Sequence, residues 1–134
     1  MTKILTVGVY DYFHLGHLRL FKQCKKYADY LIVAVQDSDS ILKYKPNAKI
    51  LYTTEERIEL VKSLKIVDET IIYKNVDEIV KEVNFDIFAV GEDQNHQGFQ
   101  NAILWCKKHG KRVVRLKRTP GICSSHIKEE LVKK

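Results

Sequence analysis

The sequence predicts an α/β fold: an open sheet of five parallel strands with helices on both faces, in one domain that spans residues 1–134. Two observations lead to this prediction. Short apolar runs alternate along the chain with segments of helical periodicity, which is the order that the crossover connections of a parallel sheet produce. Two of the apolar runs are almost uninterrupted by polar residues, as expected of strands that are buried on both faces.

Five segments have the composition of strands, because they are rich in β-branched and other apolar residues and end at turns. These segments are residues 4–9, 31–35, 70–73, 87–91 and 112–116. The second and the fourth are the most apolar. A doubly covered parallel sheet of this kind is Rossmann-like, and it binds ligands at the carboxyl ends of its strands.

The segments between the strands have apolar residues at helical spacing. The faces are Leu18 with Phe21, Ile58 with Val61 and Leu64, Ile79 with Val83, Ala102 with Trp105 and Cys106, and, after the last strand, Ile127 with Leu131. Thr53 and Glu56 have the spacing of a capping box, which predicts a helix start there. Residues 37–52 are predicted to form one long loop.

The composition fits a globular protein, with 45% hydrophobic and 30% charged residues. The first residues contain no long apolar stretch, so we expect neither a signal peptide nor a membrane span. Cys24, Cys106 and Cys123 are odd in number and have no C-x-x-C spacing, which supports neither a disulfide framework nor a structural zinc site. A reducing cytoplasm fits this pattern.

The formal net charge of +6 suits an anionic partner, which charge alone does not identify. The basic residues are spread along the chain rather than gathered in a block. Aromatic residues do not alternate with them, as they do in a groove that stacks single-stranded nucleic acid. The spread favours small phosphorylated molecules and predicts neither a nucleic acid nor a membrane as partner.

The first strand leads directly into a motif that contains His14, Gly16 and His17. A helix start offers free amides and a partial positive charge to an anion, and glycine allows close approach. Two imidazoles at this place can donate to phosphate oxygens. The alternatives are a structural role, with one histidine capping the helix and the other packing, or a metal site, for which no third ligand lies nearby in sequence. The position at a strand-to-helix junction favours phosphate.

A second motif follows the fifth strand and runs Arg118-Thr119-Pro120-Gly121-Ile122-Cys123-Ser124-Ser125. Arg118 supplies a cationic fork that suits a phosphate. Ser124 or Ser125 can cap the last helix, and capping and anion binding use the same free amides. Both roles are therefore compatible.

Together the two motifs resemble the HxGH and R-T-x-G-I-S-x-x signatures of the nucleotidyltransferase superfamily. The resemblance covers nearly the whole chain and is closest to the cytidylyltransferase branch, in particular the bacterial glycerol-3-phosphate cytidylyltransferases. The intermediate segments that support it are Lys43 and Lys45, Arg57, Val67-Asp68-Glu69 and Gly91-Glu92-Asp93.

The resemblance implies transfer of CMP from CTP to a phosphorylated polyol, such as glycerol 3-phosphate, with release of pyrophosphate. The product would be a CDP-activated precursor for an envelope or capsule polymer. The transfer would be direct, without a covalent enzyme intermediate, so catalysis would come from positioning and charge stabilisation. The resemblance also implies Mg²⁺ as cofactor and a homodimer.

The resemblance assigns three sets of residues. The catalytic set is His14, His17, Lys43, Lys45 and Arg118. The nucleotide-binding set is Val9, Tyr10, Gly16, Arg57, Gly91, Asp93, Thr119, Ile122, Cys123 and Ser124. Asp11 is the expected anchor for the water shell of Mg²⁺.

The sequence departs from the family pattern at three places. Cys123 stands where the family has a serine, and a thiol is the weaker donor. Lys65-Ile66 stands where the family has an arginine and a tyrosine, which removes an aromatic face for a quaternary ammonium and argues against choline as acceptor group. Gln94-Asn95-His96 occupies the stretch where a tryptophan commonly follows. These changes bear on the acceptor rather than on the transferase chemistry.

Three other functions are compatible with parts of the sequence. The same chemistry can use ATP or another phosphorylated acceptor, as in relatives that handle sugar phosphates or flavin. A non-catalytic nucleotide sensor is disfavoured by the intact histidines, lysines and arginine of the motifs. A nucleic-acid-binding module rests on the net charge alone, and steeply salt-dependent binding to duplex DNA would favour it.

Overall fold

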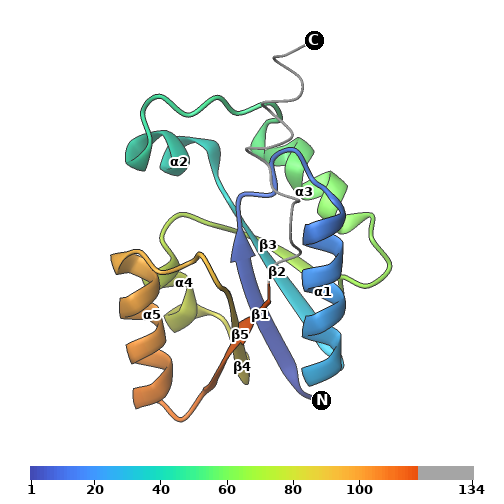
Figure 1. The fold of residues 1–134 in the computed structure, drawn as a ribbon, viewed down its shortest axis with the longest axis vertical. Coiled ribbons are helices and arrows are strands. Elements are labelled where there is room, and N and C mark those ends of the chain that lie inside the picture. Colours follow the sequence, from blue (N-terminus) through green and yellow to red (C-terminus); the bar gives the residue numbers. More distant parts are fainter. Residues whose placement is uncertain (118–134) are drawn as a thin grey trace.

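The computed structural model describes residues 1–117, and residues 118–134 lie outside the described part. Five parallel strands form one sheet in the order β3-β2-β1-β4-β5, as predicted (Figure 1). The strands are β1 (Lys3–Gly8), β2 (Tyr30–Gln36), β3 (Glu69–Tyr73), β4 (Ile87–Gly91) and β5 (Arg112–Leu116). The central strand β1 pairs with β2 on one side and with β4 on the other.

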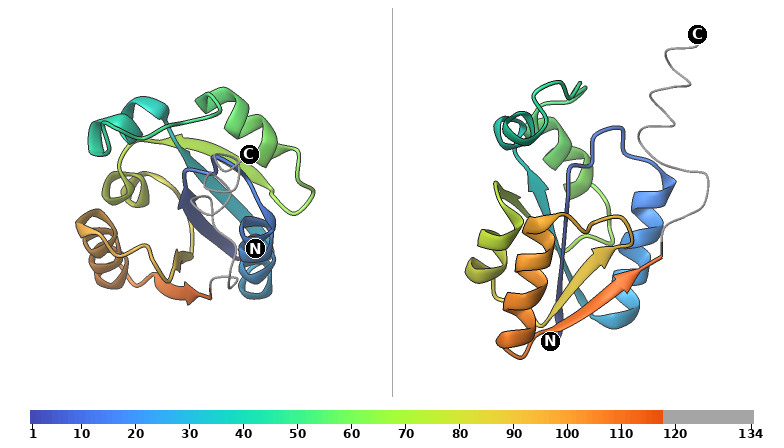
Figure 2. Two further views of the ribbon diagram at one scale, coloured as in Figure 1. Left: turned by 45° about the horizontal axis from the view of Figure 1, so that its top comes forward. Right: turned by 60° about the vertical axis from the view of Figure 1, so that its left-hand side comes forward.

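Helices cover both faces of the sheet (Figures 1 and 2). One face carries α1 (Leu15–Tyr27) and α3 (Thr54–Lys62), and the other carries α4 (Val76–Glu82) and α5 (Gln97–Lys108). A further short helix, α2 (Ser38–Tyr44), lies beyond the carboxyl ends of the strands. The predicted Rossmann-like class is therefore confirmed.

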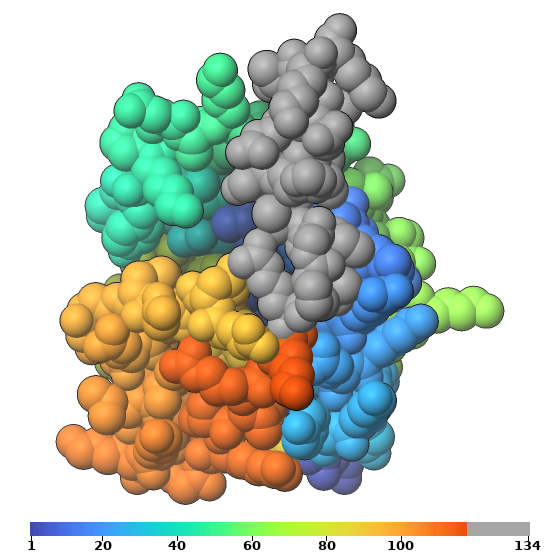
Figure 3. Space-filling view, viewed as in Figure 1, coloured from blue at the N-terminus to red at the C-terminus, as the bar shows by residue number. Residues whose placement is uncertain are grey.

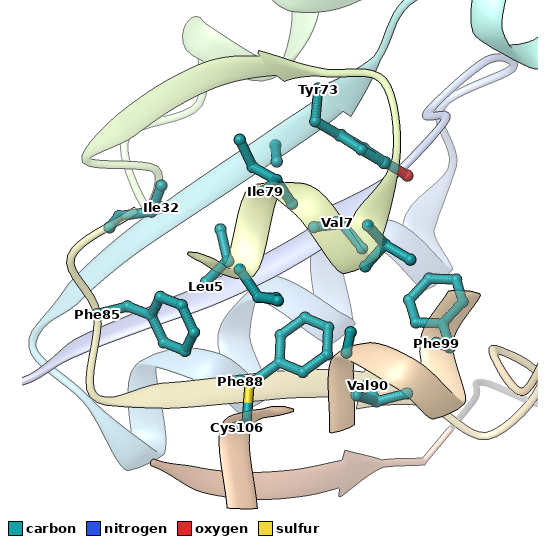
Figure 4. Close-up of a cluster of buried hydrophobic side chains, with 14 residues drawn as sticks. Leu5, Val7, Ile32, Tyr73, Ile79, Phe85, Phe88, Val90, Phe99 and Cys106 are labelled. Atoms are coloured by element: carbon teal, nitrogen blue, oxygen red, sulfur yellow. The ribbon is translucent and has the colours of Figure 1, made fainter. Parts of the chain in front are cut away.

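The core consists of two hydrophobic clusters, one on each side of the sheet. Leu5 and Val7 of β1 belong to the cluster under α4 and α5, which Figure 4 shows with Phe88 and Phe99. Ile4 belongs to the cluster under α1 and α3. This alternation with period two, together with full burial of residues 31–35, confirms strands that are covered on both faces.

The prediction of one long loop over residues 37–52 is wrong, because α2 occupies its first half. Asp37 caps this helix by accepting a hydrogen bond from the Ser40 amide at 2.7 Å. Ile41 is its buried residue. A single buried side chain in seven residues leaves no periodic apolar face, so hydrophobic patterning could not reveal the helix. The helix predicted around residues 127–131 lies outside the described residues.

The structure also bears on the predicted capping box and on the cysteines. The capping box at the start of α3 is confirmed: the Glu56 amide donates to Thr53 Oγ1 at 3.1 Å, and the Thr53 amide donates to Glu56 Oε1 at 2.9 Å. Cys24 and Cys106 are buried free thiols, and burial raises their pKa values to about 12 and about 11. Within residues 1–117, no helix is long and apolar enough to cross a membrane.

Candidate active site

A cleft of about 500 Å³ opens where the carboxyl ends of β1 and β4 separate. The β1–β4 register ends at Thr6 and Ala89, whereas the β1–β2 register continues to Gly8. From β1 the chain passes through α1 to β2 on one side of β1, and later it passes through α4 to β4 on the other side. The order of the strands therefore reverses between β1 and β4, and open α/β sheets bind ligands at such a topological switch point. Figure 3 shows the surface of the chain's N-terminal part (blue) between α2 (teal) and the start of α5 (gold).

The side chain of Gln94 connects the two separating strands. Its amide donates to the Val7 carbonyl at 2.9 Å, and its carbonyl accepts from the Gly91 amide at 2.9 Å. One side chain thus satisfies a backbone group on each strand beyond the point where their ladder ends. This contact fixes the width of the cleft floor.

The loop between β1 and α1 has an unusual backbone. Tyr10 and Tyr12 both have positive φ values, of 57° and 51°, which non-glycine residues adopt at a cost. The buried Tyr10 ring lies directly over Gly8, where a Cβ would come within 2.8 Å of the ring. Gly8 is therefore required by the packing of Tyr10, and this packing directs the loop toward the start of α1.

His14 and His17 form a capping box at the start of α1. The Gly16 amide donates to His14 Nδ1 at 3.0 Å, and the His14 amide donates to His17 Nδ1 at 3.2 Å. Because each Nδ1 accepts a hydrogen bond, each neutral ring carries its proton on Nε2. The two rings stack with centroids 3.9 Å apart, and both line the cleft. The structural interpretation is therefore right in that both rings cap the helix, while the role of the pair in phosphate binding stays a prediction.

Burial lowers the pKa of His17 to about 3, and the neighbouring His14 acts in the same direction. Phe13 and Tyr10 pack against the ring of His17, with centroids at 5.1 Å and 5.3 Å. His17 is therefore neutral at physiological pH and offers an Nε2–H donor rather than a full positive charge. Such a donor can stabilise charge that develops on a phosphate without being desolvated as an ion.

Arg57 lies behind the cleft rather than in it. Its side chain is fully buried. Its guanidinium donates to five acceptors, the carbonyls of Val9, Gln36 and Tyr52 and the hydroxyls of Ser38 and Thr54, at 2.7–3.3 Å. These contacts join the ends of β1 and β2 to α2 and α3. The structure thus gives this predicted nucleotide-binding residue the geometry of a clamp that holds the cleft wall.

Asp11 ties the segment that follows β1 to the segment that follows α2. Its carboxylate accepts from the amides of Leu51 and Tyr52 at 2.8 Å and 3.1 Å, and its side chain is buried. Residues 45–53, which we call the return loop, are held against the cleft by this contact. That Asp11 also anchors the water shell of Mg²⁺ stays a prediction.

The cleft brings together most of the predicted residues that the structure describes. Those that line it are Val9, Tyr10, Asp11, His14, Gly16, His17, Lys45, Gly91 and Asp93. Lys43 is exposed on α2 and does not line it, and Arg57 lies behind it. The other predicted residues, Arg118, Thr119, Ile122, Cys123 and Ser124, lie outside the described part of the chain.

The cleft also contains polar residues to which the sequence motifs assigned no role. Lys49, Glu92 and His96 line it. His96 caps α5 in the same way as His14 caps α1: its Nδ1 accepts from the Gly98 amide at 3.1 Å. The shared H-x-G spacing in residues 14–16 and 96–98 was a signal for this similarity. The side chain of His96 is exposed, and it lines the cleft.

The chain is similar to known proteins over almost its whole length. The model of the cytidylyltransferase-like family matches residues 5–130. The chain belongs to this family. The glycerol-3-phosphate cytidylyltransferase of Bacillus subtilis (strain 168) is 33% identical to this cytidylyltransferase-like protein over 135 residues, which cover 98% of each chain. The enzyme of the same name from Staphylococcus aureus (strain NCTC 8325 / PS 47) is also 33% identical, over 98% of this chain and 96% of its own.

Other relatives of the cytidylyltransferase-like protein carry a different name. The FAD synthase of Thermococcus sibiricus (strain DSM 12597 / MM 739) is 38% identical over 96 residues, which cover 69% of this chain and 64% of that protein. Among solved structures, the lipopolysaccharide core biosynthesis protein from Thermoplasma volcanium GSS1 has a TM-score of 0.71 at 30% identity, over 89% of this chain and 97% of its own. The protein is a nucleotidyltransferase-family enzyme. Its relatives carry two different enzyme names, so their names alone do not identify its substrates.

Proposed function

We propose that the protein transfers CMP from CTP to a phosphorylated polyol, with glycerol 3-phosphate or a close analogue as the acceptor. The observation that carries this proposal is the pair of Nε2–H donors at the start of α1, set in a cleft at the switch point of the sheet. Similarity to glycerol-3-phosphate cytidylyltransferases over almost the whole chain supports CTP and the polyol phosphate.

In the proposed reaction an oxygen of the acceptor phosphate attacks the α-phosphorus of CTP. The bond to the β-phosphate breaks, and pyrophosphate leaves with the electron pair. His14 and His17 donate to the oxygens on which charge collects, and Lys45 adds a cation on the return-loop side of the cleft. The step requires no proton from either ring, because the attacking phosphate oxygen already carries a negative charge.

Mg²⁺ is proposed to enter the cleft on the phosphates of the nucleotide. Among residues 1–117, no group of three histidine, cysteine or acidic residues can hold a metal ion. Both oxygens of Asp11 already accept backbone hydrogen bonds. Mg²⁺ is commonly held by one or two carboxylates together with substrate phosphates and water. The carboxylates of Asp11, Glu92 and Asp93 line the cleft, so one or two of them would hold such an ion together with the phosphates. When bound, it would neutralise phosphate charge and orient the leaving group.

The wall of the cleft beside β4 supports an acceptor with hydroxyl groups. Glu92, Asp93 and His96 line this wall. Carboxylates and an imidazole can exchange hydrogen bonds with hydroxyls, and a site that pairs with hydroxyls rejects analogues that lack them. The Ile66 argument against choline gains no support from the structure, because Ile66 packs against the core and does not line the cleft. The acceptor proposal therefore rests on the wall beside β4 and on the similarity to glycerol-3-phosphate cytidylyltransferases.

The quaternary structure and location belong to the same proposal. We propose a homodimer in the cytoplasm, as the family resemblance implies. Light scattering at several concentrations tests the dimer, and a monomeric mass at all of them would exclude it.

A second candidate keeps the cleft and changes the nucleotide. Several archaeal FAD synthases are 35–38% identical to this chain over about two thirds of its length. The alternative is therefore adenylyl transfer from ATP to a phosphorylated acceptor such as FMN. The FAD synthase of Picrophilus torridus is 33% identical over 97% of this chain and 96% of its own, so full-length similarity does not separate the two nucleotides. The match to the model of the cytidylyltransferase-like family supports CTP.

The test is a matrix of nucleotides and acceptors. Pyrophosphate release is measured with CTP, ATP, GTP and UTP against glycerol 3-phosphate, other polyol phosphates, phosphocholine, phosphoethanolamine and FMN, each with Mg²⁺. We expect the highest kcat/KM for CTP with a polyol phosphate. Higher activity with ATP would overturn the nucleotide assignment, and higher activity with phosphocholine or FMN would overturn the acceptor assignment.

A further inference from the structure

Two lysines border the cleft on the side of the return loop, and only one of them belongs to the motif that the family resemblance identified. Lys45 and Lys49 both line the cleft, whereas Lys43 does not. The two lysines that line the cleft are therefore not the Lys43–Lys45 pair of the motif.

Helix geometry explains why Lys43 faces away. Ile41 is buried and lines the cleft, so it marks the face of α2 that points inward. Lys45 follows four residues later and continues this face. Lys43 follows only two residues after Ile41, which places it about 200° around the helix axis, on the solvent side. A lysine at that position is separated from the cleft by the body of the helix.

The return loop delivers Lys49 to the cleft instead. The Lys45 amide donates to the Ile41 carbonyl at 2.8 Å, which ends α2, and the Ala48 amide donates to the Lys45 carbonyl at 3.0 Å, which turns the chain back. Asp11 then holds the far side of the loop through the Leu51 and Tyr52 amides. Residues 48–50, which lie between these two anchors, line the cleft beside Asp11 and His14.

Arg57 also holds the end of the return loop that Asp11 holds. Its guanidinium donates to the Tyr52 carbonyl and to the Val9 carbonyl, so it links the end of the return loop to the end of β1. The loop is therefore tied at one end to α2, which Lys45 caps, and at the other end to the strand that leads to the histidines. An ammonium held in this way can reach a phosphate chain that lies along the cleft.

We propose that Lys49 is a phosphate-binding catalytic residue that acts together with Lys45, and that Asp11 is the residue that positions it. This inference rests on the proposed function, in that the anion bound is the phosphate chain of the nucleotide. Lys49 donates hydrogen bonds to phosphate oxygens and transfers no proton. Asp11 acts through the return loop.

The first experiment compares Lys49→Ala with Lys43→Ala, and uses Lys62→Ala, an exposed lysine on α3, as the matched control. Steady-state pyrophosphate release should fall roughly a hundredfold in kcat/KM for Lys49→Ala, much less for Lys43→Ala and by less than about twofold for Lys62→Ala. The proposal is wrong if Lys49→Ala stays within about twofold of the parent protein, or if Lys43→Ala loses as much as Lys49→Ala.

A binding measurement separates this inference from the proposed function. Calorimetry with inorganic triphosphate, which contains no base and no ribose, should show weaker binding to Lys49→Ala than to Lys43→Ala. If the parent protein shows no turnover with any substrate pair, the proposed function fails, while this comparison still decides between the two lysines. Equal triphosphate affinities in the two variants would overturn the assignment of Lys49.

The role of Asp11 is tested by a double-mutant cycle. If Asp11 acts by placing Lys49, Asp11→Asn should raise the KM for the nucleotide, and the double variant with Lys49→Ala should be little worse than Lys49→Ala alone. Urea denaturation of the same proteins shows whether the loss is one of stability. Losses that multiply in the double variant would show that Asp11 acts independently of Lys49, for instance through Mg²⁺.

Discussion

The half-buried, neutral state of His17 makes the stability of the protein depend on pH in a defined way. The pKa of this ring is about 3 in the folded protein and 6.5 in a model peptide. Between these two values the unfolded chain binds a proton that the folded protein excludes, so protons favour unfolding. The stabilisation is fully present above the unfolded value and is lost as the pH falls below it. From pH 6.5 to about pH 5 the loss is about 2 kcal/mol, because each pH unit contributes about 1.4 kcal/mol.

The assay is urea denaturation, followed by circular dichroism, of the parent protein and of His17→Gln at about pH 7 and pH 5. Glutamine at this position cannot titrate, yet its side-chain oxygen can still accept from the His14 amide, as in an ordinary capping box. The fall in unfolding free energy between the two pH values should be about 2 kcal/mol larger in the parent protein. An equal fall in both proteins would refute the low pKa of His17, and with it the neutral state on which its role as donor depends.

Two further substitutions test how the cleft is held. Arg57→Met should lower the unfolding free energy by about 3–5 kcal/mol in urea denaturation, because five acceptors lose their donor in a buried site; a loss under about 1 kcal/mol would contradict the clamp. Gly8→Ala should cost about 1–3 kcal/mol, since the new methyl group would stand 2.8 Å from the Tyr10 ring. The cost of Gly8→Ala should largely disappear in a Tyr10→Ala background, and an undiminished cost there would show that the ring is not the obstacle.

The fold could be predicted from the sequence because its signals are local. The apolar runs at 31–35 and 87–91 correspond to strands that are buried on both faces, and the alternation with helices determines a parallel sheet. The position of His14 and His17 at a strand-to-helix junction located the cleft for the same reason. The carboxyl end of the central strand is where such a sheet opens.

The details that could not be predicted depend on tertiary contacts. An arginine is usually exposed or bound to a ligand, so the sequence did not predict that Arg57 is buried. Its acceptors come from the ends of two strands and from two helices, which only the folded chain brings together. The direction of Lys43 depends on a seven-residue helix whose only buried residue is Ile41. Gln94 stands in a stretch where the sequence departs from the family pattern, and only the fold shows that its side chain joins β1 to β4.

Direct nucleotidyl transfer in this cleft is tested most directly by following the α-phosphorus of CTP. CTP labelled at the α-phosphate is incubated with glycerol 3-phosphate, Mg²⁺ and the protein, and the label is followed in small molecules and in denatured protein. We expect the label to move to a CDP-polyol at the rate of pyrophosphate release, with none bound to protein, and His14→Ala to abolish most of the transfer. Label retained on the protein, or full transfer by the His14→Ala variant, would contradict it.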